Sequence, residues 1–203
     1  MLKRNLPARL LRAGLLLVVI PVFTGCAGVG AVAELANSAL EMTGLKKDKN
    51  APVEVKLTLV AGENLNVSNG QPLSMITKIY YLKNNETFMR APVNQLIDPA
   101  QEKAALGDSL IASREVPLMP GQRIESIEKV PPTAPYIAVA GLFFSPAPQR
   151  WKFVFRADEA RSTGLMIAAH ACALTVTQGK PVPLPGMPAF DPSRLASVRC
   201  PAG

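Results

Sequence analysis

The sequence predicts an all-β fold, a two-layer antiparallel β-sandwich with a short helical insertion. Polar and apolar residues alternate in "VEVKLTLVA" (53–61), which is the pattern of a strand with one buried face. Further apolar runs of strand length follow, and 14 glycines and 19 prolines supply turns between them. Six to eight short strands with hardly any helix are typical of a sandwich.

The first two strands are expected on either side of a long loop. The alternating segment 53–61 is the first strand, and the β-branched and aromatic run "SMITKIYYLK" (74–83) predicts the second. Between them, "GENLNVSNGQPL" (62–73) contains the glycine, asparagine and proline residues that interrupt regular structure.

A short helix, interrupted by Pro92, is expected between Phe88 and Leu96, where apolar residues recur at helical spacing. Residues 108–130 predict two strands around the turn formers Pro120 and Gly121. The second is ambiguous, because its apolar residues lie three apart. The remaining strands are expected at 135–144, 150–156 and 170–178, the last with one face formed by His170, Cys172, Leu174 and Val176.

The N-terminus predicts an export signal over residues 1–25. It has four basic residues and no acidic one before a run of small and apolar residues at 13–25. That run is shorter than the ~20 residues that a helix needs to cross a bilayer, so it fits a signal peptide better than a transmembrane anchor.

The segment "FTGC" resembles a bacterial lipobox and ends on Cys26. Such a signal implies diacylglyceryl transfer to the Cys26 thiol, cleavage after Gly25 and a further acyl chain on the new amino group. Two or more chains hold a protein on a membrane, whereas one chain binds only marginally. Ala27 follows instead of aspartate, so the outer membrane is the expected location. The alternative is a free cysteine that happens to end a signal sequence.

The charge of the mature chain argues against nucleic-acid binding. The net charge of +7 includes the four basic residues of the signal, which leaves 7 − 4 = +3, without a basic stripe interleaved with aromatic residues. Residues 26–51 are expected to form a lipidated tether, either a short amphipathic helix or a flexible stalk. One sandwich domain at 52–178 and a proline-rich tail at 179–203 complete the organisation.

The sequence contains few residues in catalytic or metal-binding patterns. The single histidine, His170, excludes a multi-histidine metal site, and CxxC, HExxH, GxSxG and P-loop motifs are absent from the sequence. We interpret His170 as an ordinary residue near the end of a strand, with a general base as the less favoured alternative. Asp158 and Glu159 are expected in a solvated turn. The sequence therefore predicts a non-enzyme with no cofactor beyond the lipid and no small-molecule substrate.

Cys172 and Cys200 remain after lipidation of Cys26, and an exported domain lies in a compartment that favours disulfides. We expect a bridge between them that pins the tail against the last strand. Two free thiols are the alternative.

A series of segments follows a particular order between Cys26 and about Val176. They are "FTGC", "LEMTGL", a strand ending in "NLN", "GQPL", "IYYLK", the helical stretch at 88–96, "LMPGQ", "YIAVAGLFF" and the aromatic strand at Trp151. Their order and spacing resemble TssJ, the outer-membrane lipoprotein family of the type VI secretion system. The resemblance implies a transthyretin-like sandwich on the periplasmic face of the outer membrane. It also implies binding to the periplasmic C-terminal domain of TssM, as part of the TssM/TssL membrane complex.

In that family the loop between the first two strands contributes to the TssM contact, which maps onto residues 62–72. The contact residues implied here are Asn64, Leu65, Asn66, Val67, Ser68, Asn69, Gly70 and Gln71. Their amides offer hydrogen bonds, while Leu65 and Val67 offer apolar area. Two alternatives stay open: this segment is a solvated hairpin loop, or the protein is a periplasmic carrier or chaperone with a ligand cavity inside the sandwich.

Overall fold

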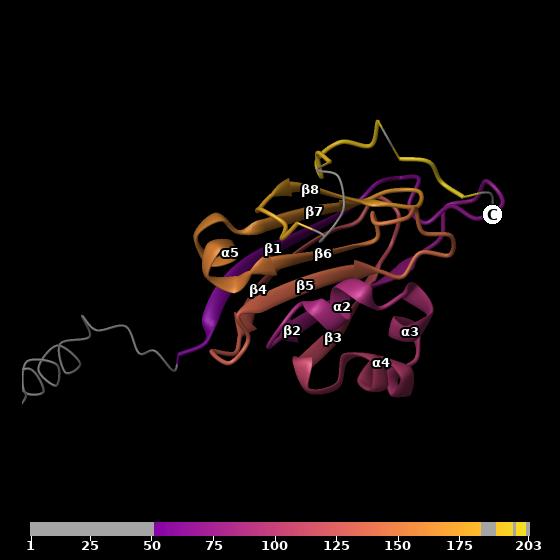
Figure 1. Cartoon of the computed structure of the whole chain (residues 1–203). Helices are drawn as coiled ribbons and strands as arrows, with labels where there is room; N and C mark the ends of the chain where they lie inside the picture. The colour runs from indigo at the N-terminus through magenta and orange to yellow at the C-terminus, as the bar shows by residue number, and fades with distance from the viewer. Residues whose placement is uncertain (1–50, 184–189, 197, 202–203) are drawn as a thin grey trace, which may run out of the picture. The chain divides into compact units, whose positions relative to one another are not determined.

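The computed structural model describes residues 51–183, 190–196 and 198–201. The predicted signal peptide, the lipidation site Cys26 and most of the tether lie outside the described residues. Two four-stranded sheets face each other, in the strand orders β4-β1-β7-β8 and β3-β2-β5-β6 (Figure 1). The strands are β1 (Val53–Ala61), β2 (Met75–Leu82), β3 (Leu110–Leu118), β4 (Arg123–Val130), β5 (Tyr136–Gly141), β6 (Lys152–Arg156), β7 (Leu165–Ala169) and β8 (Leu174–Gln178).

The predicted two-layer sandwich is confirmed. The pairing of β1 with β7 is parallel, whereas the other pairings between the described strands are antiparallel. β7 can run parallel to β1 because the chain crosses from one sheet to the other through α5 (Ala157–Thr163). The ambiguous segment is strand β4, in which Ile124 and Val130 face the interior and Ile127 lies exposed on the opposite face.

Two local expectations were wrong. Asp158 and Glu159 begin helix α5 instead of lying in a turn, because Ala157 and Ala160 are buried and hold this segment against the domain. The expected strand at 170–178 begins only at Leu174: residues 170–173 form a tight turn closed by the hydrogen bond from His170 N–H to Ala173 O (2.9 Å). The preceding strand β7 was not predicted.

The helical insertion is longer than the expected stretch at 88–96. It comprises α2 (Glu86–Arg90), α3 (Val93–Ile97), α4 (Pro99–Leu106) and the 3₁₀ turn η1 (Gly107–Ser109). Asp98 starts α4, because its side chain accepts a hydrogen bond from Gln101 N–H (2.9 Å) and Pro99 occupies the first turn.

A buried ion pair fixes these helices to the outer face of the β3-β2-β5-β6 sheet. Lys78 Nζ on β2 lies 2.6 Å from Glu102 Oε1 on α4, and both side chains are buried. Tyr80 donates its hydroxyl to the same oxygen (2.6 Å), and Lys78 also donates to Leu96 O (3.2 Å). Each buried charge therefore has hydrogen-bond partners, as burial requires.

A second polar cluster joins the two sheets from inside. Glu128 on β4 is buried and accepts hydrogen bonds from Tyr81 Oη (2.6 Å), Ser126 Oγ (2.5 Å) and Arg114 Nε (2.9 Å). Burial alone would raise the pKa of Glu128, but the hydrogen bonds from Arg114, Ser126 and Tyr81 outweigh it and lower that pKa.

Four connections between consecutive strands lie at the same end of the sandwich. β1, β3, β5 and β7 end there, and the following strands begin there. We call it the loop end, and it is formed by residues 62–74, 119–122, 142–151 and 170–173. β1 begins at the opposite end, where α5 lies (Figure 1).

Candidate functional site: the loop end

Residues 64–73 of the β1–β2 connection form a hairpin with a tight turn at its tip, and we call this segment the hairpin. Ser68 and Gln71 exchange backbone hydrogen bonds of 3.0 and 2.9 Å. Asn69 and Gly70 between them have φ angles of 49° and 74°. Positive φ at both central residues is the requirement of a type I′ turn, and Asn-Gly is its preferred pair. This predicted contact segment is therefore a defined protrusion.

Asn66 fastens the base of this hairpin to the β5–β6 connection. Its Nδ2 donates to Ser74 O (3.0 Å), and its Oδ1 accepts a hydrogen bond from the backbone N–H of Phe144 (2.7 Å). The side chain of Asn66 is buried. The backbone φ angle of Asn66 is 47°, which asparagine tolerates better than most residues do. The Asn66 side chain therefore links the β1–β2 connection to the β5–β6 connection by hydrogen bonding.

The β7–β8 turn supports the same hairpin from the other side. His170 O and Ala171 O accept the backbone N–H groups of Asn66 (3.0 Å) and Val67 (2.9 Å). Cys172 O accepts the N–H of Ala147 (2.8 Å) in the β5–β6 connection. These three connections therefore form one hydrogen-bonded unit.

The β3–β4 turn packs beside this unit. Gln122 O accepts the N–H of Ala61 (2.8 Å), and Gly121 donates to Gly62 O (3.3 Å). A Cβ atom at position 121 would lie 2.7 Å from the Glu63 carboxylate, and the φ of +73° also favours glycine there.

The structure divides the eight predicted contact residues by exposure. Leu65 is fully buried, so it cannot offer apolar contact area, and that part of the prediction was wrong: Leu65 belongs to the core. Asn66 is buried as well. Val67 and Ser68 are half-buried, and the exposed positions are Asn64, Asn69, Gly70 and Gln71.

The sequence interpretation missed three exposed apolar side chains at the loop end. Leu73, Met119 and Phe144 are 40%, 57% and 65% exposed, and each lies on a different connection. The signal for Phe144 was present, because Phe143 before it is buried and neighbouring residues of an extended segment point to opposite sides. Exposed apolar side chains on three of the four connections give the loop end apolar area of the kind that a protein partner covers.

His170 has a structural environment. Its Nε2 lies 2.9 Å from Thr175 Oγ1, its backbone oxygen supports the hairpin, and burial lowers the pKa of its imidazole. Across the described ranges, we find no group of three or more His, Cys, Asp or Glu residues that could hold a metal ion. No helix in this part of the chain is long and apolar enough to cross a bilayer.

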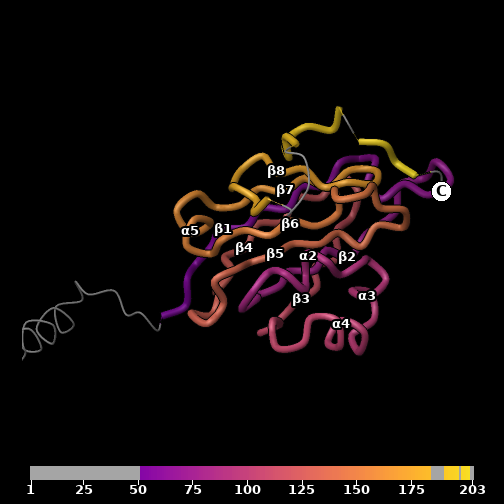
Figure 2. The backbone as a smooth tube through the Cα atoms, viewed as in Figure 1, coloured from indigo at the N-terminus to yellow at the C-terminus, as the bar shows by residue number. Residues whose placement is uncertain are grey.

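The described tail residues contact both sheets: Val182 N–H donates to Val154 O on β6 (2.7 Å), and residues 190–194 lie against β8 and the β5–β6 connection. We call residues 190–196 and 198–201 the strap (Figure 2, in yellow). Val176 on β8 donates its N–H to Pro192 O (2.9 Å), and Arg150 donates to Asp191 O (3.2 Å) and to Arg194 O. The bond between Cys172 and Cys200, whose Cα atoms are 5.6 Å apart, joins the strap to the β7–β8 turn.

Comparison with known proteins relates this chain to a known family. The family model T6SS-SciN, described as type VI secretion lipoprotein (VasD, EvfM, TssJ), matches residues 53–172. Among curated protein sequences, no match was found.

Solved structures of type VI secretion proteins are also similar to this chain. The lipoprotein TssJ1 from Pseudomonas aeruginosa is 26% identical with a TM-score of 0.56, and the match covers 65% of this chain and 99% of that one. A chain of a structure titled "Type VI membrane complex" is 29% identical (TM-score 0.56, 62% and 98% covered). A chain of a structure titled for the TssM C-terminal domain from EAEC is 28% identical (TM-score 0.52, 61% and 96% covered).

The family match spans the sandwich from the first residue of β1 to the β7–β8 turn. The solved relatives share the two-sheet, transthyretin-like architecture over nearly their whole length. The predicted resemblance is confirmed, and the chain belongs to the type VI secretion lipoprotein family that includes TssJ.

Proposed function

We propose that this protein is an outer-membrane lipoprotein that binds the periplasmic C-terminal domain of TssM and so links the TssM/TssL complex to the outer membrane. The observation that carries the proposal is the loop end, where a defined hairpin protrudes among the exposed side chains of Leu73, Met119 and Phe144. A defined protrusion with apolar area and exposed amide side chains suits recognition of a folded protein.

The interior favours this role over that of a carrier. Core side chains of both sheets fill the space between them, including Leu57, Ile79, Val139 and Phe155, each at most 1% exposed. A carrier needs an apolar cavity large enough to enclose its ligand. The proposed role is therefore one of assembly, without catalysis and without a small-molecule substrate.

The family also supports the proposed anchoring at Cys26. In this proposal residues 1–25 are a signal peptide, residues 26–51 form a lipidated tether, residues 52–178 form the sandwich and residues 179–203 form the tail. The domain would then lie on the periplasmic face of the outer membrane. β1 begins opposite the loop end, so the first described residues of the domain lie away from the proposed partner surface.

The direct test is co-purification of the mature, unlipidated chain (27–203) with the periplasmic C-terminal domain of TssM from the same genome. A stable complex supports the proposal. If the chain binds none of the periplasmic TssM segments, the proposed adaptor role is wrong.

A further inference from the structure

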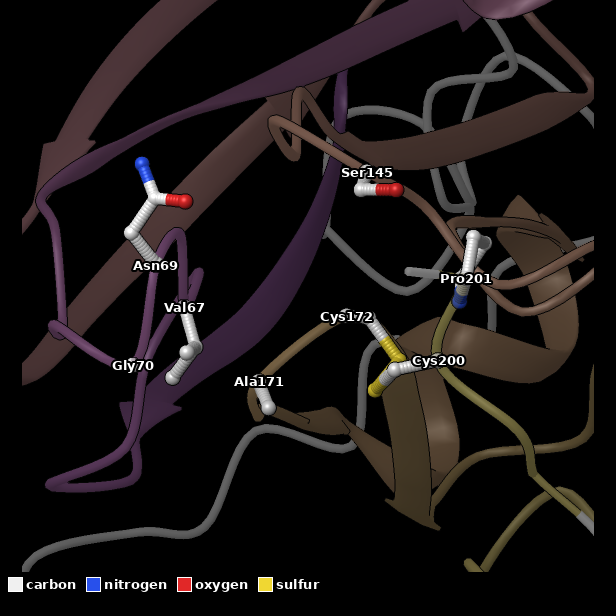
Figure 3. A pocket seen from close by; sticks show the side chains of 8 residues that line it. All are labelled: Val67, Asn69, Gly70, Ser145, Ala171, Cys172, Cys200 and Pro201. Carbon is white, nitrogen blue, oxygen red and sulfur yellow. A yellow bond between two sulfur atoms is a disulfide. The ribbon is translucent and has the colours of Figure 1, made fainter. Parts of the chain in front are cut away.

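A hollow of about 260 Å³ lies between the hairpin and the strap (Figure 3). Val67 and Asn69 stand on one side of it, and the Cys172–Cys200 bond and Pro201 stand on the other. The residues that line it are Val67, Asn69, Gly70, Ser145, Ala171, Cys172, Cys200 and Pro201.

The lining determines what the hollow can accept. None of the eight described residues that line it is charged, and valine, alanine, proline and the disulfide make its walls mostly apolar. A charged group would lose hydration there without finding an ionic partner. The volume is also below the roughly 300–1,000 Å³ of small-molecule sites. An uncharged side chain of a protein partner fits both properties.

The walls are held in place on both sides. The backbone N–H of Val67 donates to Ala171 O, and Cys172 O accepts the N–H of Ala147. On the strap side, the disulfide fixes Cys200 to the β7–β8 turn. A preformed pocket of this kind lets one inserted side chain contribute strongly to affinity, because little ordering is required on binding.

The hollow continues the surface assigned to the partner. Val67, Asn69 and Gly70 belong both to the hairpin and to the lining of the hollow. Cys200 and Pro201 instead lie beyond residues 53–172, which the family model matches. One wall is therefore an addition to the part of the chain that defines the family.

We propose that the strap forms a second part of the partner-binding surface, and that the hollow receives one uncharged, apolar side chain of the same TssM periplasmic domain. This inference rests on the proposed function. It adds a specificity contact made by residues outside the family match.

The test is to fill the hollow. Ser145→Phe places a large side chain in it without altering the hairpin, and Ser113→Phe, at an exposed position on β3, is the matched control. A titration against the TssM domain should show roughly thirtyfold weaker binding for Ser145→Phe, because loss of a central anchor commonly has that effect, and unchanged binding for the control. Thermal melts of both variants report whether the fold is intact.

A second variant releases the strap side of the hollow, whereas Ser145→Phe fills the hollow. Cys172→Ser with Cys200→Ser frees the end of the strap and should weaken binding while the hairpin remains. Tight binding by the unmodified chain that survives both Ser145→Phe and the double serine variant would overturn the inference alone. Failure of the unmodified chain to bind would overturn the proposed function and this inference with it.

Discussion

The side chain of Asn66 accepts a hydrogen bond from the backbone N–H of Phe144, 78 residues further along the chain, at 2.7 Å. This contact joins the β1–β2 hairpin to the connection that carries the most exposed phenylalanine of the loop end. The hairpin proposed to bind the partner therefore depends on the buried side chain of Asn66 as well as on its own turn.

Asn66→Ala should destabilise the domain by about 2 kcal/mol, because Phe144 N–H and Ser74 O lose their partner inside the protein. Alanine is also less tolerant of the φ of 47°. Chemical denaturation measures the change. Asn69→Gly is the control, since glycine accepts the same turn geometry, and equal stability of the two variants would contradict the role of the Asn66 hydrogen bonds.

Acid should destabilise the domain partly through Glu128. The folded state lowers the pKa of this carboxyl from its ordinary value of 4.5, so the unfolded state binds the proton more readily. The stabilisation is present above that ordinary pKa and is lost as the pH falls through the lower, folded pKa. Glu128→Gln should be less stable at pH 7 and should lose less stability on acidification. Parallel acid dependence of both proteins in denaturation at pH 3–7 would exclude this role.

The Cys172–Cys200 bond closes a loop with a sequence separation of 28. The chain-entropy model gives a stabilisation of about 3.6 kcal/mol for a loop of that length. Replacing both cysteines with serine should lower the melting temperature accordingly. Thiol titration of the unreduced, denatured mature domain should detect no free thiol, and two reactive thiols would show that the bond does not form.

The anchor can be separated from the fold. Cys26→Ser should leave the sandwich folded, release the protein from the outer membrane and stop secretion, because no acyl chain can then be attached. Membrane fractionation and a secretion assay measure the two effects. A Cys26→Ser protein that stayed with the outer membrane and supported secretion would contradict the lipobox interpretation.

Local patterns predicted much of the fold. Alternation at 53–61 and the apolar run at 135–144 correspond to β1 and β5, because one or both faces of those strands are buried. Helix α5 was missed because "ADEARST" is mostly polar, and only contacts of Ala157 and Ala160 reveal its buried side. β7 was missed because the turn that ends it lacks the usual glycine, proline or asparagine.

The site was predictable only in part. Asn69-Gly70 is a strong hairpin signal that can be recognised directly in the sequence. The burial of Leu65 depends instead on how the β1–β2 connection folds onto the other loops, and alternation cannot report that for a segment without regular structure. The wall formed by Cys200 and Pro201 depends on the path of the strap.

The burial of Leu65 also decides how the hairpin should be tested. Deleting Leu65 to Asn69 would remove a core side chain and the hydrogen bonds of Asn66, so lost binding could reflect lost fold. Substitution of exposed residues avoids this problem. The test variant carries Asn64→Lys, Gln71→Lys and Leu73→Lys, which leave the positive-φ residues Asn69 and Gly70 unchanged. The control carries three lysines at exposed sites towards the other end, Ala112→Lys, Ser162→Lys and Thr177→Lys.

Titration of these two variants against the TssM periplasmic C-terminal domain, with a thermal melt of each, tests the central claim most directly. We predict that the hairpin variant binds at least about thirtyfold more weakly, because loss of a few central contacts commonly costs ~2 kcal/mol or more, while its melt matches that of the control. Unchanged affinity of the hairpin variant, with an intact fold, would contradict the assignment of the loop-end hairpin as the partner-binding surface.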